Sequence, residues 1–282
     1  MPDGQTESQF AATCHGVGVP PSRYLHDGRI ERINAGAYEG DEIRGALSVV
    51  GPEDTVLEIG AGIGVVGGVI AHNCKPRRVL SFEANPELID EIRALHTANG
   101  LTGISVENAV LFSTPDRPAK VPFFLHKSYL GSSLTNPGRK LRKKVKVPTR
   151  DFDSVCAGLD PTVLIMDIEG GELDILEHAD LSRFRAIVLE FHPAVYGVEG
   201  MRRCKSILRK AGLRPVSEVS TRTVWTCTRD APEADTVSAD ADAAAAAVET
   251  VADAPETDIV TGASDTPKAK SGKAAKAQEA GT

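Results

Sequence analysis

The chain has 282 residues, of which 41% are hydrophobic, and a formal net charge of −7 at pH 7. This length is enough for one or two domains with an apolar core. No apolar run approaches the ~20 residues needed to span a bilayer, and no basic start followed by an apolar stretch indicates a signal peptide. The five cysteines are widely spaced and form no Cys-x-x-Cys pair, which favours reduced thiols over a disulfide framework or a zinc site. We therefore expect a cytoplasmic protein without a membrane span.

The composition changes abruptly at residue 231. Residues 231–282 contain ten acidic residues and four lysines, much Ala, Thr and Pro, and no aromatic residue. Such a segment cannot bury a core, so we expect a disordered acidic tail with a lysine-bearing end. The opening, residues 1–27, lacks periodicity and is expected to be flexible. One folded domain then covers residues 28–230, and the acidity of the chain belongs to the tail.

After a helix expected near residues 41–49, a short strand over residues 55–59 leads into a glycine-rich turn. The strand contains an acid, Glu58, and is followed by Gly60, Gly62 and Gly64, after which an apolar run predicts a helix. Glycines at such a junction let the backbone turn sharply and approach a ligand where a Cβ would collide. The pattern therefore predicts a site for a nucleotide-like cofactor.

A second strand, over residues 78–83, ends in Glu83, and Asn85 and Pro86 follow it. An acid at this point can accept hydrogen bonds from both hydroxyls of a ribose. Pro86 fits the first position of a helix over residues 86–98, where its missing N–H is not needed. Strand, glycine turn, helix, strand and acid together predict an adenosine site on a doubly wound sheet.

Two cofactors share that geometry. A dinucleotide needs Gly-x-Gly-x-x-Gly, which Gly62, Gly64 and Gly67 match, although this motif starts beyond the end of the strand. S-adenosylmethionine has no phosphate and carries a cationic sulfonium and an amino group. The carboxylate of Glu58 suits that cation and is awkward beside a pyrophosphate. The residues therefore favour S-adenosylmethionine, with an NAD(P)-dependent oxidoreductase as the alternative.

The middle of the chain is expected to be rich in strands. A strand over residues 104–109 carries Asn108, which is expected beside adenine, although Asn at a strand end is equally typical of a turn. A basic segment over residues 110–150 follows. Lysines and arginines in such a run usually form a solvated edge, with an anionic acceptor as the alternative. Few aromatic residues accompany them to stack bases, so nucleic acid is not expected as a partner.

The second half alternates strands and helices, which predicts a parallel sheet covered by helices on both faces. The expected elements are a strand over residues 162–167, a helix over 171–178, a strand over 185–191, a helix over 199–211 and a closing hairpin over 214–219 and 222–228.

Ligands of open α/β sheets bind beyond the carboxyl ends of the strands, which places Asp167, Glu190 and His192 in the candidate site. If S-adenosylmethionine is the cofactor, methyl transfer needs alignment and then a base, and these three residues are the catalytic candidates. For His192, a general base and a structural histidine are equally good interpretations. The same three side chains could also converge on Mg²⁺, although no tight spacing pattern supports a metal site.

Four segments taken together resemble the FkbM family of S-adenosylmethionine-dependent methyltransferases. They are V-L-E-I-G-A-G-I-G, F-E-A-N-P, I-M-D-I-E-G-G-E-L-D-I-L and V-L-E-F-H-P, and the likeness spans about residues 38–228. The resemblance implies a Rossmann-like, seven-stranded class I methyltransferase sheet with helices on both faces and an antiparallel last strand. It also implies methylation of a hydroxyl on a small molecule or glycan, and it places Ser132 on a loop that approaches the cofactor.

The same domain could also bind a cofactor without turnover. In that non-enzymatic alternative the protein is a platform for partners, which it would contact through the acidic tail.

Overall fold

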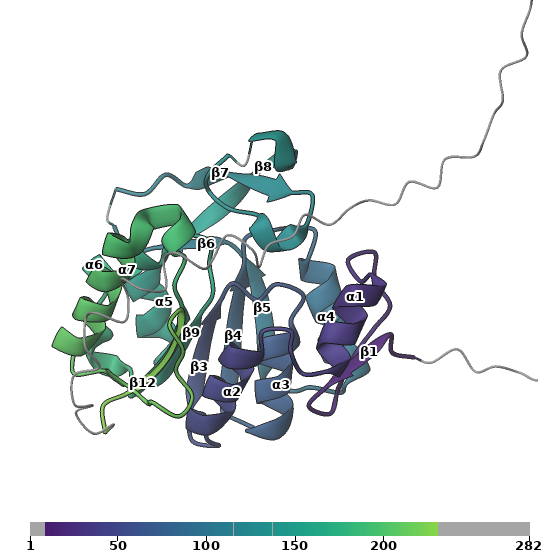
Figure 1. The fold of residues 1–282 in the computed structure, drawn as a ribbon, viewed down its shortest axis with the longest axis horizontal. Helices are drawn as coiled ribbons and strands as arrows, with labels where there is room; N and C mark the ends of the chain where they lie inside the picture. The colour runs from purple at the N-terminus through teal and green to yellow at the C-terminus, as the bar shows by residue number, and fades with distance from the viewer. Residues whose placement is uncertain (1–8, 115, 137, 231–282) are drawn as a thin grey trace, which may run out of the picture. The chain divides into compact units, whose positions relative to one another are not determined.

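The computed structural model describes residues 9–114, 116–136 and 138–230, and the expected tail lies outside them (Figure 1). Its main sheet has seven strands in the order β11-β12-β10-β9-β3-β4-β5. All run parallel except β12, which is antiparallel to both of its neighbours. This confirms the predicted sheet and its antiparallel last strand. The strands are β3 (Thr55–Ile59), β4 (Arg78–Glu83), β5 (Ile104–Asn108), β9 (Val163–Met166), β10 (Ala186–Glu190), β11 (Arg214–Pro215) and β12 (Val224–Thr228).

Helices cover both faces of this sheet, in two groups that Figure 1 shows on its opposite sides. Alternate residues of each strand face opposite ways, as the two-residue period of a strand requires. In β3, Val56 faces the core shared with α2 (Gly40–Val49) and α3 (Val65–Asn73). Leu57 faces the other core, shared with α5 (Phe152–Leu159), α6 (Glu172–His178) and α7 (Pro193–Lys210). Burial on both faces explains why the sequence shows continuous apolar runs here.

A second, three-stranded sheet lies above the carboxyl ends of the main strands, at the top of Figure 1. Its order is β6-β8-β7, and it matches the strand-rich segment that the sequence predicts over residues 110–150. The members are β6 (Val110–Phe112), β7 (Lys120–His126) and β8 (Leu141–Asp151), with short 3₁₀ helices η1 (Tyr129–Gly131) and η2 (Gly138–Lys140) between the last two strands. The loop that contains η1 is important for the site.

Structure before residue 28 was not predicted. β1 (Ala12–Cys14) and β2 (Val17–Val19) form a hairpin whose buried side chains pack in the same core as α3 and α4 (Ile89–Ala98), and α1 (Asp27–Asn34) follows. Strands of three residues are too short to show a recognisable alternation. The turn residues His15 and Gly16 both have positive φ, at 46° and 83°, as two-residue hairpins of the favoured type require.

Helix boundaries differ from expectation at two places. α4 begins at Ile89, not at Pro86, because the side chain of Asn85 accepts a hydrogen bond from the amide of Glu87 and holds a turn there. α7 begins at Pro193, well before the predicted start at residue 199, and its backbone is non-helical at Gly197. α5 follows the N-cap Asp151 and was not predicted. Within the described residues, no helix is both long and apolar enough to cross a membrane.

Candidate functional site

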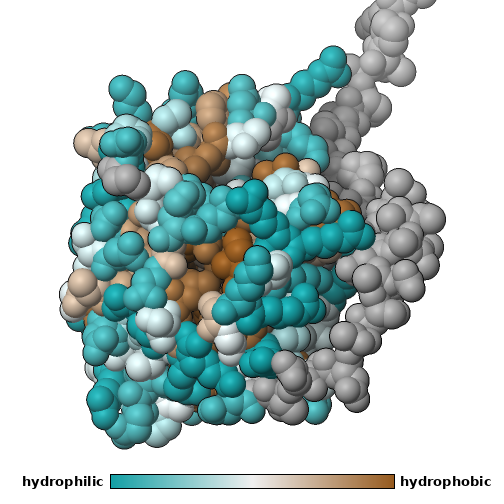
Figure 2. All heavy atoms as spheres, turned by 90° about the vertical axis from the view of Figure 1, so that its left-hand side faces the viewer, coloured by the Kyte–Doolittle hydropathy of each residue, from teal (hydrophilic) through white to brown (hydrophobic). Residues whose placement is uncertain are grey.

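A cavity of about 570 Å³ opens at the carboxyl ends of β3, β4, β9 and β10, with the loop around η1 on its opposite side. This volume is within the usual range for small-molecule sites. Figure 2 views the molecule from the left-hand side of Figure 1 and shows its centre hollowed, with apolar residues inside the hollow. The cavity lies where ligands of open α/β sheets bind.

The glycine turn after β3 forms one edge of the cavity and is held to both neighbouring strands. The amides of Gly60 and Ala61 donate hydrogen bonds of 2.9 and 3.1 Å to the carbonyl of Phe82, and the amide of Asp167 donates to the carbonyl of Ile59 at 3.0 Å. Gly60 has φ +92°, and a Cβ there would overlap the carbonyl oxygen of Asp167. Glycine at this position therefore lets the ends of β3 and β9 meet.

Glu58 lies at the base of the cavity, beneath α3, and is 2% exposed. Its carboxylate accepts a hydrogen bond from the hydroxyl of Ser81, and burial raises its pKa. A Cβ on Gly67 would overlap this carboxylate, so the third glycine of the dinucleotide-like pattern is needed for packing. The Gly-x-Gly-x-x-Gly spacing is therefore explained without a pyrophosphate.

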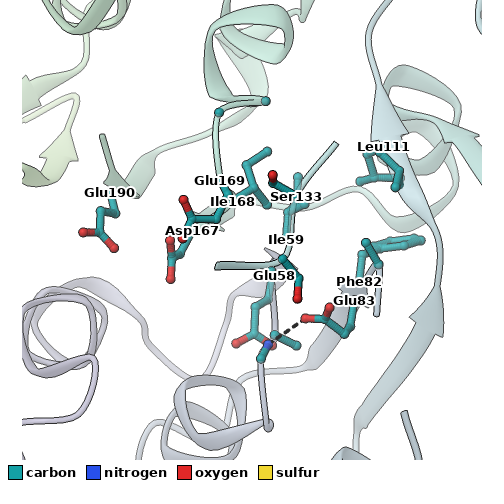
Figure 3. Close-up of a pocket in the computed structure, with 18 of the residues that line it drawn as sticks. Glu58, Ile59, Phe82, Glu83, Leu111, Ser133, Asp167, Ile168, Glu169 and Glu190 are labelled. Carbon is teal, nitrogen blue, oxygen red and sulfur yellow. Dashed lines mark hydrogen bonds between the residues drawn. The ribbon is translucent and has the colours of Figure 1, made fainter. Parts of the chain in front are cut away.

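Glu83 presents a preoriented carboxylate to the cavity. One of its oxygens accepts a hydrogen bond from the amide of Gly62 at 2.8 Å (Figure 3), and the other accepts from the amide of Asn85 at 2.7 Å. Burial, aided by the charge of Glu58, raises its pKa to about 7 despite these two hydrogen bonds. Phe82 and Leu111 lie beside Glu83 at this end of the cavity, as Figure 3 shows.

Two tyrosines close the cavity on the side of the second sheet. The hydroxyls of Tyr38, before α2, and Tyr129, on η1, are 2.8 Å apart, and both side chains are buried. The guanidinium of Arg29 lies 4.6 Å from the ring centre of Tyr129. Burial raises the pKa of Tyr129 to about 12. The pair ties the loop around η1 to the segment before α2.

At the opposite end of the cavity from Glu83, Asp167, Glu190 and His192 come together. Each offers one ligand atom, and these atoms lie within 4.8 Å of one another. Nε2 of His192 is 3.6 Å from an oxygen of Asp167 and 3.8 Å from one of Glu190. Its Nδ1 lies 2.5 Å from Oε1 of Glu172, which is fully buried. These distances are compatible with a metal ion. Carboxylates and an imidazole are also the groups that act as general acids and bases.

The charges of the cluster are strongly coupled. Burial lowers the pKa of His192, but the hydrogen bond to Glu172 and the neighbouring carboxylates outweigh this effect and raise it to about 9. Burial and the charges of Glu39 and Glu190 raise the pKa of Asp167 well above its ordinary value. Burial also raises the pKa of Glu190. At neutral pH this site therefore holds an imidazolium among carboxyl groups whose pKa values are raised.

The structure brings most of the sequence-predicted site residues to the cavity. Those that line it are Glu58, Gly60, Gly62, Glu83, Ser132, Asp167, Glu190 and His192. Gly64, Asn85 and Asn108 do not line it. Gly64 is instead the N-cap of α3, with φ 85°. The side chain of Asn108 donates hydrogen bonds to the carbonyls of Glu83 and Ala84, so Asn85 and Asn108 both support the turn that carries Glu83.

Sequence reasoning missed two features of the site. Glu42, in the first turn of α2, lines the cavity and is 5% exposed. An acid in a first turn is the ordinary pattern of a helix start, so the sequence gives no sign of it. The apolar wall contributed by Phe112 and Phe123 was also missed, although both belong to the segment expected to form strands.

The strand order and the glycine turn define a Rossmann-like, class I methyltransferase fold. The family model described as the methyltransferase FkbM domain matches residues 58–215, more than half of the chain, and the chain belongs to this family. This confirms the resemblance found in the sequence. A comparison with curated proteins found no match.

Solved structures of similar fold include a precorrin-6y C5,15-methyltransferase from Geobacter metallireducens GS-15. It is 14% identical, with 67% of this chain and 86% of that chain covered and a TM-score of 0.41. Another is a ribosomal protein L11 methylase from Lactobacillus delbrueckii subsp. bulgaricus, at 12% identity, 67% and 77% coverage and a TM-score of 0.41. A third is TYW2 from M. jannaschii, solved in complex with AdoMet, at 15% identity, 72% and 74% coverage and a TM-score of 0.35.

Proposed function

We propose that this chain is an S-adenosylmethionine-dependent methyltransferase that methylates a hydroxyl of a small molecule or glycan. One observation carries the proposal. In a single cavity, the preoriented carboxylate of Glu83 and the glycine turn lie at one end, and the cluster of Asp167, Glu190 and His192 lies at the other. The first group suits a nucleoside and the second suits removal of a proton.

The residues present fit the methyl donor. The two amides that hold Glu83 leave its carboxylate facing the cavity, where it can accept hydrogen bonds from a ribose. Gly60 and Gly62 leave space for the methionine portion beside the turn, and Glu58 supplies negative charge close by. Phe82 and Leu111 offer apolar surface for the adenine ring. When bound, S-adenosylmethionine supplies an electrophilic methyl group.

The cluster at the other end supplies the base. Burial and neighbouring carboxylates raise the pKa of Asp167 well above its ordinary value, whereas burial raises the pKa of Glu190 and the hydrogen bond with Asp167 opposes this effect. We therefore assign the negative charge of the pair to Glu190. His192, with a pKa of about 9, is already protonated and stabilises that charge. We therefore assign Glu190 as the group that accepts the acceptor's hydroxyl proton, while Asp167 and His192 position it.

The proposal is tested by methyl transfer from labelled S-adenosylmethionine to a panel of hydroxyl-bearing acceptors. We expect Glu190→Gln to abolish turnover while S-adenosylhomocysteine still stabilises the variant against thermal unfolding. Turnover at the wild-type rate in Glu190→Gln would contradict the assignment of the base. An NAD-dependent stabilisation without one by S-adenosylhomocysteine would support the oxidoreductase alternative instead.

A further inference from the structure

The cavity contains more carboxyl groups than the methyl donor alone requires. Apart from Glu58 and Glu83 in the donor half, six further carboxylates line it, and none of the lining residues is a lysine or an arginine. The six are Glu39, Glu42, Asp167, Glu169, Asp174 and Glu190. His192 is the single basic side chain that lines the cavity, so it can balance only one of these charges.

Glu42 is a buried acid in the acceptor half of the cavity. It is 5% exposed, lines the cavity, and its carboxylate has no hydrogen-bond or ion-pair partner from any other residue in the described part of the chain. Burial and the charge of Glu39 raise its pKa to about 7. A buried acid is costly unless it is paired, and a cationic ligand group beside Glu42 would pair it.

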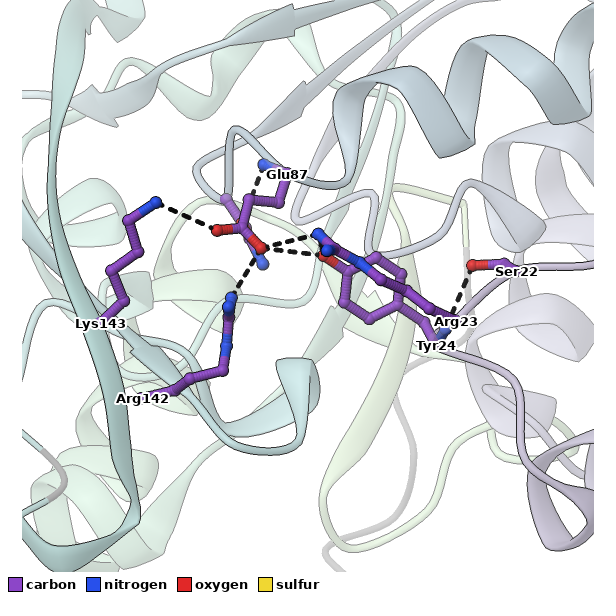
Figure 4. A network of polar contacts seen from close by, with 7 residues as sticks. Ser22, Arg23, Tyr24, Glu87, Arg142 and Lys143 are labelled. Carbon is purple, nitrogen blue, oxygen red and sulfur yellow. Dashed lines mark hydrogen bonds and ion pairs between the residues drawn. The ribbon is translucent and has the colours of Figure 1, made fainter.

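The basic stretch of the sequence does not face the cavity. Arg142 and Lys143 of β8 bind the carboxylate of Glu87, which also accepts hydrogen bonds from Arg23 and Tyr24 (Figure 4). The ion-pair distances from Arg142 and Lys143 are 2.7 and 3.4 Å. These cations therefore fasten the second sheet to the turn before α4, and a phosphate or carboxylate on the acceptor would meet His192 as the single basic side chain that lines the cavity among the residues that the structure describes.

The rim of the cavity is apolar. Among the described residues, three large hydrophobic side chains are exposed: Leu130 at 40%, Leu134 at 36% and Val195 at 47%. Leu130 and Leu134 line the cavity. Val195 packs against Gly170, another lining residue, since a Cβ on Gly170 would lie 2.5 Å from its Cγ1. Exposed apolar side chains in and beside a cavity favour a ligand that has an apolar portion.

We propose, building on the methyltransferase function above, that the acceptor is a cationic amphiphile: a hydroxyl-bearing amine whose ammonium group lies against Glu42 and the neighbouring carboxylates and whose apolar portion contacts Leu130, Leu134 and Val195. The ammonium group pairs with the buried acid, and the apolar portion covers the rim. The hydroxyl then lies close to Glu190.

The test measures affinity for three probes of equal chain length that differ in charge: aminooctanol, octanediol and hydroxyoctanoate. Each is titrated calorimetrically into the full chain, with and without saturating S-adenosylhomocysteine. We expect aminooctanol to bind about tenfold more tightly than octanediol, equivalent to about 1.4 kcal/mol, and hydroxyoctanoate to bind most weakly. Equal or tighter binding of hydroxyoctanoate would overturn the proposal.

Two kinds of variant separate the charge from the apolar rim. Glu42→Gln and Glu190→Gln should each reduce the preference for aminooctanol over octanediol, whereas Glu53→Gln, at an exposed acid outside the cavity, should leave it unchanged. Leu130→Asn should weaken all three probes alike. A preference that survives in both acid variants would place the amine elsewhere and overturn the proposal.

The two proposals fail separately. If S-adenosylhomocysteine binds the wild-type chain but the probe preference is absent, only the acceptor class is wrong. If S-adenosylhomocysteine does not bind, the methyltransferase function is wrong, and the titrations without it still test the cation site. Thermal unfolding of each variant with S-adenosylhomocysteine shows that its fold is intact.

Discussion

Oε1 of Glu172 lies 2.5 Å from Nδ1 of His192, although the two residues belong to different helices and are 20 positions apart. Glu172 is fully buried at the start of α6, and His192 is the N-cap residue of α7. The hydrogen bond fixes the imidazole so that Nδ1 faces inward and Nε2 faces Asp167 and Glu190. Glu172 therefore positions the cluster without reaching the cavity itself.

Replacing Glu172 by Gln removes this charge and should lower the pKa of His192 from about 9 toward or below its ordinary value of 6.5. Burial, which opposes protonation, is then balanced by fewer neighbouring charges. Titration of the His192 ring by NMR measures the change. Glu177→Gln, on the same helix but paired with Arg203, is the matched control and should leave the His192 pKa in place. A His192 pKa that stays near 9 in Glu172→Gln would contradict the positioning role.

The stability of the ligand-free protein should fall as the pH rises from mildly acidic to alkaline. Burial raises the pKa of both Glu39 and Glu42 from 4.5 to about 7, and the neighbouring carboxylates raise that of His192 from 6.5 to about 9. For a raised pKa, the contribution to stability is complete below the unfolded value and is lost as the pH passes the folded value. The losses therefore occur between pH 4.5 and about 7 for the two acids and between pH 6.5 and about 9 for His192.

Urea unfolding at about pH 5.5 and about pH 8.5 measures this difference. Glu42→Gln should reduce the loss between about pH 5.5 and about 7, because one of the groups that loses its proton in this interval is gone. A free energy of unfolding that is higher at about pH 8.5 than at about pH 5.5 would contradict this prediction.

Gly60→Ala should destabilise the fold more than Gly138→Ala, although both substitutions replace a glycine of positive φ. Both Gly60, with φ +92°, and Gly138, with φ +62°, adopt a backbone conformation that is unfavourable for alanine. At Gly138 a Cβ meets nothing within 4 Å, whereas at Gly60 it overlaps the carbonyl of Asp167. The difference between the two variants in free energy of unfolding therefore reports the collision, which we expect to exceed ~1 kcal/mol. Equal losses would show that the ends of β3 and β9 need not touch.

A chelator should leave turnover unchanged. The atoms of Asp167, Glu190 and His192 are close enough for a metal ion, but the pKa of His192 is raised to about 9, so a metal ion would have to displace a proton from its imidazole at neutral pH. Turnover measured with EDTA, and then with added Mg²⁺ or Mn²⁺, tests this. A rate that collapses with EDTA and returns with either ion would contradict the acid–base assignment and support a metal site.

The sequence predicts the sheet well because its strands are buried on both faces. Continuous apolar runs such as residues 163–166 are visible in a single sequence, and the glycine turn after β3 follows from steric requirements. The hairpin around His15 and Gly16 was missed because its strands have three residues each. α5 was missed as well, and it is a short helix of eight residues.

Side-chain roles are harder to predict, because position along a strand does not tell which way a polar group faces. Asn85 and Asn108 follow the strands expected to bind adenosine, yet both are hydrogen-bonded to the turn around Glu83. Glu172 lies in the first turn of α6, where an acid is favourable for the helix dipole alone, and its contact with His192 depends on how α6 and the start of α7 pack together. Glu42 could be found only from the burial of α2 against the sheet.

The most direct test of the central claim is thermal unfolding of the full chain with S-adenosylmethionine, S-adenosylhomocysteine or NAD. A ligand at about 100 times its dissociation constant adds roughly 2.7 kcal/mol to the stability of the fold. We predict a rise in Tm with both sulfur compounds but not with NAD, lost in Glu83→Ala and retained in the control Glu107→Ala, whose side chain pairs with Arg150 outside the cavity. Absence of a shift with both sulfur compounds, or an undiminished shift in Glu83→Ala, would contradict a methyl-donor site in this cavity.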